Sequence, residues 1–521
     1  MTATRRNLLR ASSAAAVASL LDAQAPNAPY RLYWGDLHNH NSVGYAQGSI
    51  ERTYDIARGH LDFLAFTPHA QWHDMPAMPN NAHLTWVKGF AALRDNWEKV
   101  RRLAHDSNRP GEFVSLLAYE WHSSFFGDYC LYYPDEGPLA YFDDVRKLQR
   151  HAQAANALII PHHLAYRQGL RGANFNFFDP SVSPILEIYS EHGLSEQDRG
   201  GRDYITHSNG GRWTRNTLRA FLRKGLRAGV IASTDDHLGY PGAYGEGLAG
   251  VYAPELTRAG LFEALRARRT IAATGDRIGL VFRLNGRWMG SSLAHTRHRE
   301  LTVEARGADE IERIEVLKND RVIHRYFPED ALGPLASWPA ELLSRVEFGW
   351  GPWGALAMNR TCDWDFDLRL DTGKILDAVP CFQSGPYDEK RRNRIERLSD
   401  STFRAVSYTS RTDAYAERAT NAVILRIAAP PSAWLELTLR QPRAMSIRRK
   451  LGDLIESSEV ELTGPFQSES VLLHRLVRPE MYRVSTRLRD LGKAGQTDWY
   501  YARVYQSNGH QAWSSPIWVE R

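Results

Sequence analysis

The chain has 521 residues, of which 43% are hydrophobic and 24% are charged, and its formal net charge is +5. This length and composition predict two to four domains with filled hydrophobic cores and exclude a disordered or fibrous chain. The charge is mild for the length, and no basic cluster is interleaved with stacking aromatic residues. We therefore expect no nucleic-acid partner.

The N-terminal residues are typical of an export signal. Arg5 and Arg6 precede a small apolar stretch at 11–21, and Ala23-Gln24-Ala25 offers a small-residue cleavage site. This pattern is typical of bacterial twin-arginine signals. We assign residues 1–29 to a signal and linker, and we predict a periplasmic or secreted protein that is a partner of the twin-arginine export machinery. No later segment reaches about 18 uninterrupted apolar residues, so we predict no stable membrane insertion.

Residues 30–278 alternate short apolar runs with segments of helical periodicity. The apolar runs lie at 32–37, 62–67, 114–119, 158–160, 184–186 and 229–234, and the helical segments lie at 49–60, 84–104, 143–155 and 214–227. Strand followed by helix, repeated, predicts an α/β fold with a parallel sheet or barrel.

Each apolar run leads into a residue that can bind a metal ion. The first run ends in His38-Asn39-His40, where two imidazoles two residues apart on an extended chain point the same way. The other runs lead to His69, Glu120, His162 and His163, Glu187, and Asp235 with His237. Fourteen of the 19 histidines precede residue 240. Because parallel strands bring their C-terminal ends to one rim, this pattern predicts a metal centre.

Residues 279–521 change to alternating apolar and polar positions, as at 301–305, 313–317 and 435–439. Asn285-Gly286 and Asn508-Gly509 are typical of hairpin turns. We therefore predict a C-terminal antiparallel domain similar to a β-sandwich. Cys130 lies in an apolar run and is expected to be a buried free thiol, whereas Cys362 and Cys381 could pair in an oxidising compartment.

Taken together, the motifs resemble the PHP (polymerase and histidinol phosphatase) superfamily of metal-dependent phosphoesterases. The resemblance is closer to a PHP-like family long labelled a domain of unknown function, and it covers nearly all of the mature chain. The resembling segments are 35–40, 66–69, 160–162, 187–189, 233–237, 499–504 and 513–518. The resemblance implies a distorted (β/α)7 barrel that holds two or three divalent ions.

The resemblance also implies a ligand set. His38, His40, Glu120 and Asp235 would hold one ion, and Glu120 would bridge to a second ion completed by His69, His162 or both. His237 matches the last histidine of an Asp-x-His motif, so Glu120, Asp235 and His237 form the expected catalytic group. Mixed imidazole and carboxylate ligands favour Zn, Mn or Fe.

Two departures from the family pattern bear on the number of ions. Segment 41–45 lacks the acidic residue that commonly follows the first His-x-His, and Pro68 stands where an aspartate is common. Fewer carboxylates favour two ions, with three kept open.

Neighbouring residues receive supporting roles. Successive strand residues face opposite sides, so only one of His162 and His163 is expected to bind metal, and the resemblance favours His162. Asp36 is expected to orient a ligand imidazole. For His73 and His122 a structural role is favoured, with metal or substrate contact as the alternative. The expected substrate contacts are His163, Glu187, Arg167, Arg171 and His192. The two arginines are included because arginine can bind anionic oxygens in a bidentate manner.

The favoured function is an exported hydrolase that uses a metal-activated hydroxide, most simply on a phosphoester within a small or oligomeric anionic substrate. No Gly-x-Ser-x-Gly motif suggests a protein nucleophile. One alternative is hydrolysis of an amide, lactone or carboxyl ester by the same centre. Another is a non-catalytic carbohydrate- or cell-wall-binding protein, since fold alone does not fix function.

Overall fold

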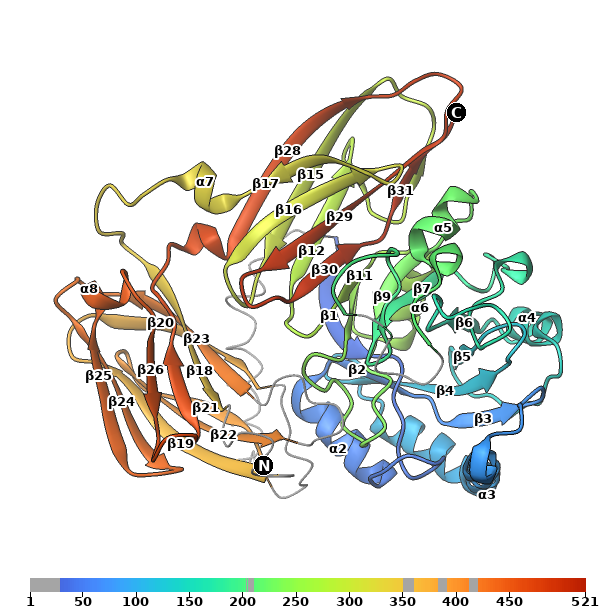
Figure 1. Ribbon diagram of the computed structural model, residues 1–521, viewed down its shortest axis with the longest axis horizontal. Coiled ribbons are helices and arrows are strands. Elements are labelled where there is room, and N and C mark those ends of the chain that lie inside the picture. Colours follow the sequence, from blue (N-terminus) through green and yellow to red (C-terminus); the bar gives the residue numbers. More distant parts are fainter. Residues whose placement is uncertain (1–28, 203, 205–209, 350–359, 383–390, 412–419) are drawn as a thin grey trace, which may run out of the picture.

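A computed structural model describes residues 29–202, 204, 210–349, 360–382, 391–411 and 420–521. The predicted export signal lies, apart from Pro29, outside the described residues, and export stays a prediction. The structure is a mixed α/β protein with many strands and few helices. Figure 1 shows three bodies: an α/β body in blue and green, a β body of yellow and red strands, and a second β body in orange.

The α/β body contains the strands expected from the six apolar runs, together with further strands and a further helix that were not predicted. Its strands are β1 (Arg31–Asp36), β2 (Phe63–Phe66), β3 (His69–Trp72), β4 (Val114–His122), β5 (Tyr129–Tyr133), β6 (Leu158–Pro161), β7 (Ile185–Ser190), β8 (Gly193–Leu194), β9 (Gly229–Ala232), β10 (Leu248–Ala253) and β11 (Thr270–Ala273). Its helices are α2 (Ile50–His60), α3 (His83–Ser107), α4 (Val145–Ala154), α5 (Leu218–Arg223) and α6 (Arg258–Arg266).

One predicted helix is interrupted. The segment expected to be helical over 214–227 is a 3₁₀ turn at Thr214–Asn216 followed by α5. Thr217 has extended backbone angles, and its side chain accepts a hydrogen bond from Ala220 N–H. A threonine in this position starts a new helix, because its hydroxyl satisfies a free N–H of the first turn.

The sheet of the α/β body is mixed. β1, β2 and β4 are parallel neighbours, as predicted, but β10 is antiparallel to β1, and β5 lies antiparallel between β4 and β6. β7 and β9 form a separate parallel pair. A parallel bridge between Asn39 and Asp236 connects the extension of β9 to that of β1. The C-terminal ends of β1, β4, β6 and β9 therefore meet around one centre.

The burial of β4 explains how the strands hold that centre. All nine of its residues are buried, as expected for a strand covered on both sides. α3 covers it with the apolar side chains Phe90, Leu93 and Val100. Among the described residues, no helix combines the length and hydropathy needed to cross a bilayer.

The first β body consists of two packed sheets. One contains β12 (Gly279–Leu284), β13 (Arg287–Trp288), β15 (His298–Arg306) and β28 (Arg483–Leu491), and the other contains β14 (Ser292–Leu293), β16 (Ile311–Lys318), β17 (Arg321–Tyr326), β29 (Asp498–Gln506), β30 (Gln511–Ser514) and β31 (Ile517–Val519). The turns predicted at 285–286 and 508–509 join β12 to β13 and β29 to β30. β30 also pairs with β11, so one sheet runs from the α/β body into this β body.

The second β body lies between β17 and β28 in the chain. Its strands are β18 (Leu342–Gly349), β19 (Arg360–Leu370), β20 (Lys374–Cys381), β21 (Arg394–Ser399), β22 (Thr402–Arg411), β23 (Thr420–Ala428), β24 (Trp434–Gln441), β25 (Met445–Lys450), β26 (Glu459–Leu462) and β27 (Ser470–Leu473), with short helices α7 (Pro328–Leu332) and α8 (Leu451–Leu454) nearby. They form two five-stranded antiparallel sheets around a separate core. Antiparallel structure was predicted for this region, and the boundary at residue 279 stays a prediction.

The cysteines are free. Cys130, Cys362 and Cys381 are all buried thiols. The free thiol predicted for Cys130 is therefore present, and the pairing considered for Cys362 and Cys381 is not formed.

Candidate metal centre

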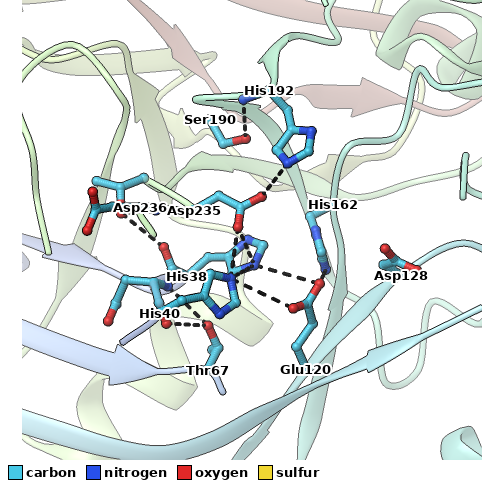
Figure 2. Close-up of polar contacts among 12 residues, drawn as sticks. His38, His40, Thr67, Glu120, Asp128, His162, Ser190, His192, Asp235 and Asp236 are labelled. Atoms are coloured by element: carbon cyan, nitrogen blue, oxygen red, sulfur yellow. Dashed lines mark hydrogen bonds and ion pairs between the residues drawn. The ribbon is translucent and has the colours of Figure 1, made fainter. Parts of the chain in front are cut away.

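Imidazoles and carboxylates from distant parts of the chain converge at the strand ends (Figure 2). Asp235 Oδ1 lies 2.8 Å from His40 Nε2 and 3.2 Å from His38 Nε2. Glu120 Oε1 lies 3.1 Å from His162 Nε2. All five side chains are at most 2% exposed. The predicted group of His38, His40, Glu120, His162 and Asp235 is thus assembled in one buried place.

A second group of histidines surrounds the other oxygen of Glu120. His69 Nδ1 lies 2.5 Å from Glu120 Oε2, and His122 Nε2 lies 3.2 Å from the same oxygen. The opposite nitrogen of His69, Nε2, lies 3.2 Å from His237 Nε2. Glu120 therefore faces one histidine group with each oxygen, as a bridging carboxylate would.

Asp36 supports the centre in a way the sequence did not predict. Its Oδ1 accepts the main-chain N–H groups of His38 and Thr234, each at 3.1 Å. Its Oδ2 accepts the Thr234 hydroxyl at 2.5 Å and the Gly242 N–H at 2.9 Å. Asp36 was expected to orient a ligand imidazole, and the contacts that the structure shows are to the backbone next to the ligands. Asp36 fixes the main chains that carry His38 and Asp235.

Two residues in left-handed conformations bring their side chains inward. Asp235 has a φ of 58° and His163 a φ of 32°. Such values are uncommon outside glycine and concentrate at functional sites. The expectation that His162 and His163 point to opposite faces is wrong, because β6 ends at Pro161 and the chain turns. His163 Nε2 lies 2.9 Å from His162 Nδ1 and 3.5 Å from Asp235 Oδ2.

Carboxylate and phenol oxygens orient the imidazoles from behind. His38 Nδ1 lies 3.1 Å from Glu187 Oε2, His237 Nδ1 lies 3.1 Å from Glu191 Oε1, and His122 Nδ1 lies 3.2 Å from Asp128 Oδ2. Tyr166 Oη lies 2.8 Å from His192 Nδ1. A partner on Nδ1 leaves Nε2 free to face the centre, which is the usual arrangement behind metal-binding histidines.

The electrostatics of His40, His162 and Glu120 favour the protonation states that metal binding requires. For His38 and His122, burial opposes protonation, but the carboxylates of Asp235 and Glu120, respectively, raise the pKa of the imidazole. Burial lowers the pKa of His40 to about 3 and, together with the neighbouring His38, that of His162 to about 4. Burial opposes ionisation of Glu120, yet His122, His69 and His162 hold the pKa of its carboxyl well below the ordinary range. Burial raises the pKa of Glu187 to about 7, with His38 opposing the rise.

The side chains present fit divalent ions. His38 and His40 approach each other through Nε2 at 3.2 Å, and two neutral imidazoles can make only one hydrogen bond there, whereas a cation accepts both lone pairs. Glu120 Oε2 and His162 Nε2 are buried atoms with no hydrogen bond of acceptable geometry among the described residues. Histidine nitrogen and carboxylate oxygen are ligands suited to Zn, Mn or Fe.

The residues predicted to contact substrate lie in different settings. His163 lies at the centre, Glu187 contacts His38, and His192 Nε2 is 3.1 Å from Asp235 Oδ2. Arg171 is buried, with its guanidinium on Asp128 at 2.5 Å, whereas Arg167 is exposed. Arg171 therefore does not offer a free guanidinium to an anion in this conformation.

Three further side chains belong to the centre. His122 was given a structural role, although its spacing of two from Glu120 on a strand is the same signal that picked out His38 and His40. The Cys130 thiol lies within 4.8 Å of ligand atoms of His38 and His162, and burial raises its pKa to about 12. The Tyr45 hydroxyl lies 3.1 Å from His237 Nε2, a contact that no local pattern indicates.

Comparisons with known proteins give relatives without an assigned activity. No family model matches the chain. An uncharacterized protein of Chlamydia trachomatis is 29% identical over 318 residues, which cover 57% of this chain and 49% of the relative. Uncharacterized proteins of Chlamydia pneumoniae and Chlamydia muridarum are 24% and 25% identical, over 58% and 57% of this chain and 50% and 49% of their own lengths. The chain thus spans about half the length of the curated relatives it matches.

One solved structure is also similar to this chain. It is a two-domain protein from Bacteroides vulgatus that contains a predicted PHP-like metal-dependent phosphoesterase. The similarity covers 58% of this chain and 87% of that protein, at 15% identity and a TM-score of 0.31.

Proposed function

We propose that the protein is a metal-dependent hydrolase acting on phosphoesters. The observation that supports this best is the position of Glu120 between two buried histidine groups, with His162 3.1 Å from one oxygen and His69 2.5 Å from the other. A carboxylate placed in this way is suited to bridging two ions. When bound, two such ions lower the pKa of water and stabilise the charge that develops on phosphoryl oxygens.

Exposure indicates the side from which substrate approaches. His38, His40, Glu120 and His162 are at most 1% exposed. The His237 side chain is 18% exposed, and its Nε2 contacts the Tyr45 hydroxyl. Substrate would therefore approach across His237 and Tyr45.

The chain's own groups can hold and orient a substrate at this entrance. Tyr45 stacks on His69, with ring centroids 4.3 Å apart, so the position of its hydroxyl is fixed. Burial raises the pKa of Tyr45 well above the ordinary value, which keeps its hydroxyl protonated as a donor. A fixed donor beside a charged oxygen stabilises the transition state more than the ground state. Glu120 and Asp235 stay ionised to hold the centre together.

The experiment combines metal restoration with a substrate screen. Protein stripped by a chelator is reloaded with Zn, Mn or Fe and assayed with phosphomonoesters, phosphodiesters, carboxyl esters and lactones. We expect metal-dependent release of phosphate or alcohol from at least one phosphoester. Turnover confined to carboxyl esters or lactones would favour the alternative hydrolase. No turnover with any metal, together with binding of glycans, would favour the non-catalytic alternative.

A further inference from the structure

We propose that His122 is a metal ligand and that it forms, with His69 and Glu120, an ion position beside α3. The proposal rests on the proposed function only in requiring divalent ions at this centre. Glu120 and His122 are two residues apart on β4, so their side chains leave the same face of the strand. His122 is fully buried, with its ring centroid 5.1 Å from that of Trp86 on α3.

The three ligand atoms have the separations of a shared coordination site. His69 Nδ1 and His122 Nε2 lie 2.9 Å apart, and they lie 2.5 Å and 3.2 Å from Glu120 Oε2. Bonds of about 2.0–2.1 Å to a tetrahedral zinc ion place neighbouring ligand atoms roughly 3.3 Å apart. The three atoms are slightly closer than this, so small outward shifts would let them surround one ion.

Asp128 selects the tautomer that a ligand needs. Its Oδ2 lies 3.2 Å from His122 Nδ1, and an ionised carboxylate can only accept, so in the neutral imidazole Nδ1 carries the hydrogen and Nε2 keeps its lone pair. Arg171 Nε donates to Asp128 Oδ2 at 2.6 Å. Arg171 itself lies over Trp72 and Trp86, at 5.0 Å and 5.3 Å from the ring centroids. Arg171 is therefore a positioning residue for the His122–Asp128 pair.

A competing role for His122 can be stated from the same contacts. Arg171 Nη also lies 3.3 Å from His122 Nδ1. If Nδ1 accepted that hydrogen bond, Nε2 would carry the hydrogen and donate it to Glu120 without binding metal. The ligand role and the donor role predict different behaviour for a substitution that keeps a donor and loses the imidazole.

His69 explains why His122 matters for the number of ions. The Nε2 side of His69 faces His237 and His40, and its Nδ1 side faces Glu120 and His122. In a neutral imidazole only one ring nitrogen has a lone pair free to bind a metal, so His69 can be a ligand on only one of its two sides at a time. His122 supplies the second imidazole on the Glu120 side and thereby favours an ion there.

The test measures zinc in the purified full chain, by elemental analysis and by equilibrium titration of metal-free protein. We expect about two ions in the wild type and one fewer in both His122→Ala and His122→Gln, or a second site weakened at least about 100-fold. Asp128→Asn should weaken that site by about 10- to 100-fold. His122→Asp, which restores a ligand atom, should recover part of the second site. Cobalt substitution gives an independent readout, because the visible absorption of the second site should disappear in His122→Gln.

His73→Ala is the matched control. His73 follows β3, stacks on Trp121 and is 24% exposed, and it should keep wild-type zinc content. Two tight zinc ions in His122→Gln would overturn the proposal and assign His122 the donor role. A different outcome would separate the two proposals. If the wild-type protein binds about two zinc ions but hydrolyses no ester, the proposed function is refuted and the assignment of His122 as a ligand still holds.

Discussion

Asp36 and Thr234 join the ends of two strands that are almost two hundred residues apart in the chain. The Asp36 carboxylate accepts both the N–H and the hydroxyl of Thr234, at 3.1 Å and 2.5 Å. Next to this contact, Asp235 N–H donates to His38 C=O at 2.7 Å and His40 N–H donates to Asp236 C=O at 2.9 Å. His38 and Asp235 lie next to these hydrogen bonds, so the geometry of the hydrogen bonds sets the distance between the two side chains.

Replacing Asp36 should weaken the hydrogen bonds that connect the end of β1 to the segment after β9 and so lower the stability of the fold. In Asp36→Asn, an amide N–H would face donors, and one or two buried donors would lose their acceptor at about 1–3 kcal/mol each. We expect the free energy of unfolding to fall by about 2–4 kcal/mol. Urea titration followed by tryptophan fluorescence measures this. Asp55→Asn, on the exposed side of α2, should change it by no more than about 0.5 kcal/mol. An unchanged transition in Asp36→Asn would contradict the structural role.

Removing the central carboxylates should remove metal without unfolding the chain. Glu120 lies two residues before the end of β4 and Asp235 lies three residues beyond β9, so Glu120→Gln and Asp235→Asn should leave the apolar core in place. We expect loss of at least one ion per chain and a drop in hydrolysis of about 10³-fold or more. Elemental analysis and circular dichroism check the two halves of this prediction. Glu98→Gln, with a side chain 79% exposed on α3, should match the wild type. Full metal content in both carboxylate variants would refute the assignment.

Removing the Tyr45 hydroxyl should affect turnover and leave metal content unchanged. Tyr45→Phe keeps the ring that stacks on His69 but loses the group 3.1 Å from His237. We expect kcat to fall by about 10- to 100-fold, with a smaller change in KM, because a donor that acts mainly in the transition state is lost. Steady-state kinetics on the best phosphoester measures this. Tyr141→Phe, on an exposed loop, is the control. A rise in KM with unchanged kcat would assign Tyr45 to ground-state binding.

The ionisation of Asp276 should make the free energy of unfolding depend on pH in the acidic range. Burial opposes its ionisation, but Arg345 and His510 lower its pKa to about 2. The folded pKa is below the unfolded value of about 3.9, so its contribution of about 2–3 kcal/mol is complete above about pH 5 and is lost as pH falls towards 2. Thermal unfolding at pH 7 and pH 3 should show a smaller pH effect in Asp276→Asn than in the wild type. Asp135→Asn, 79% exposed, should keep the wild-type dependence, and an equal dependence in Asp276→Asn would contradict the prediction.

The sequence by itself predicted six strands of the α/β body and the end of each of them at which metal-binding residues lie. A three- to six-residue apolar run followed by a polar ligand is a local pattern, and the two-residue period of a strand placed His38 and His40 on one face. The same period applies to Glu120 and His122, so that pair was also available from the sequence. The sequence analysis favoured a structural role for His122, and its role as a metal ligand is a proposal from the structure.

The tertiary structure decided which partners those side chains meet. Glu187 contacts His38 from 149 residues away in the chain, Asp36 accepts hydrogen bonds from Thr234, and Arg171 contacts Asp128 and two tryptophans. The antiparallel places of β5 and β10 and the split of the C-terminal region into two cores are equally non-local. A local pattern fixes the face of a strand from which a side chain emerges. The distance to a residue on another strand depends on sheet order, on turns such as the left-handed one at His163, and on burial, and only the folded chain sets these.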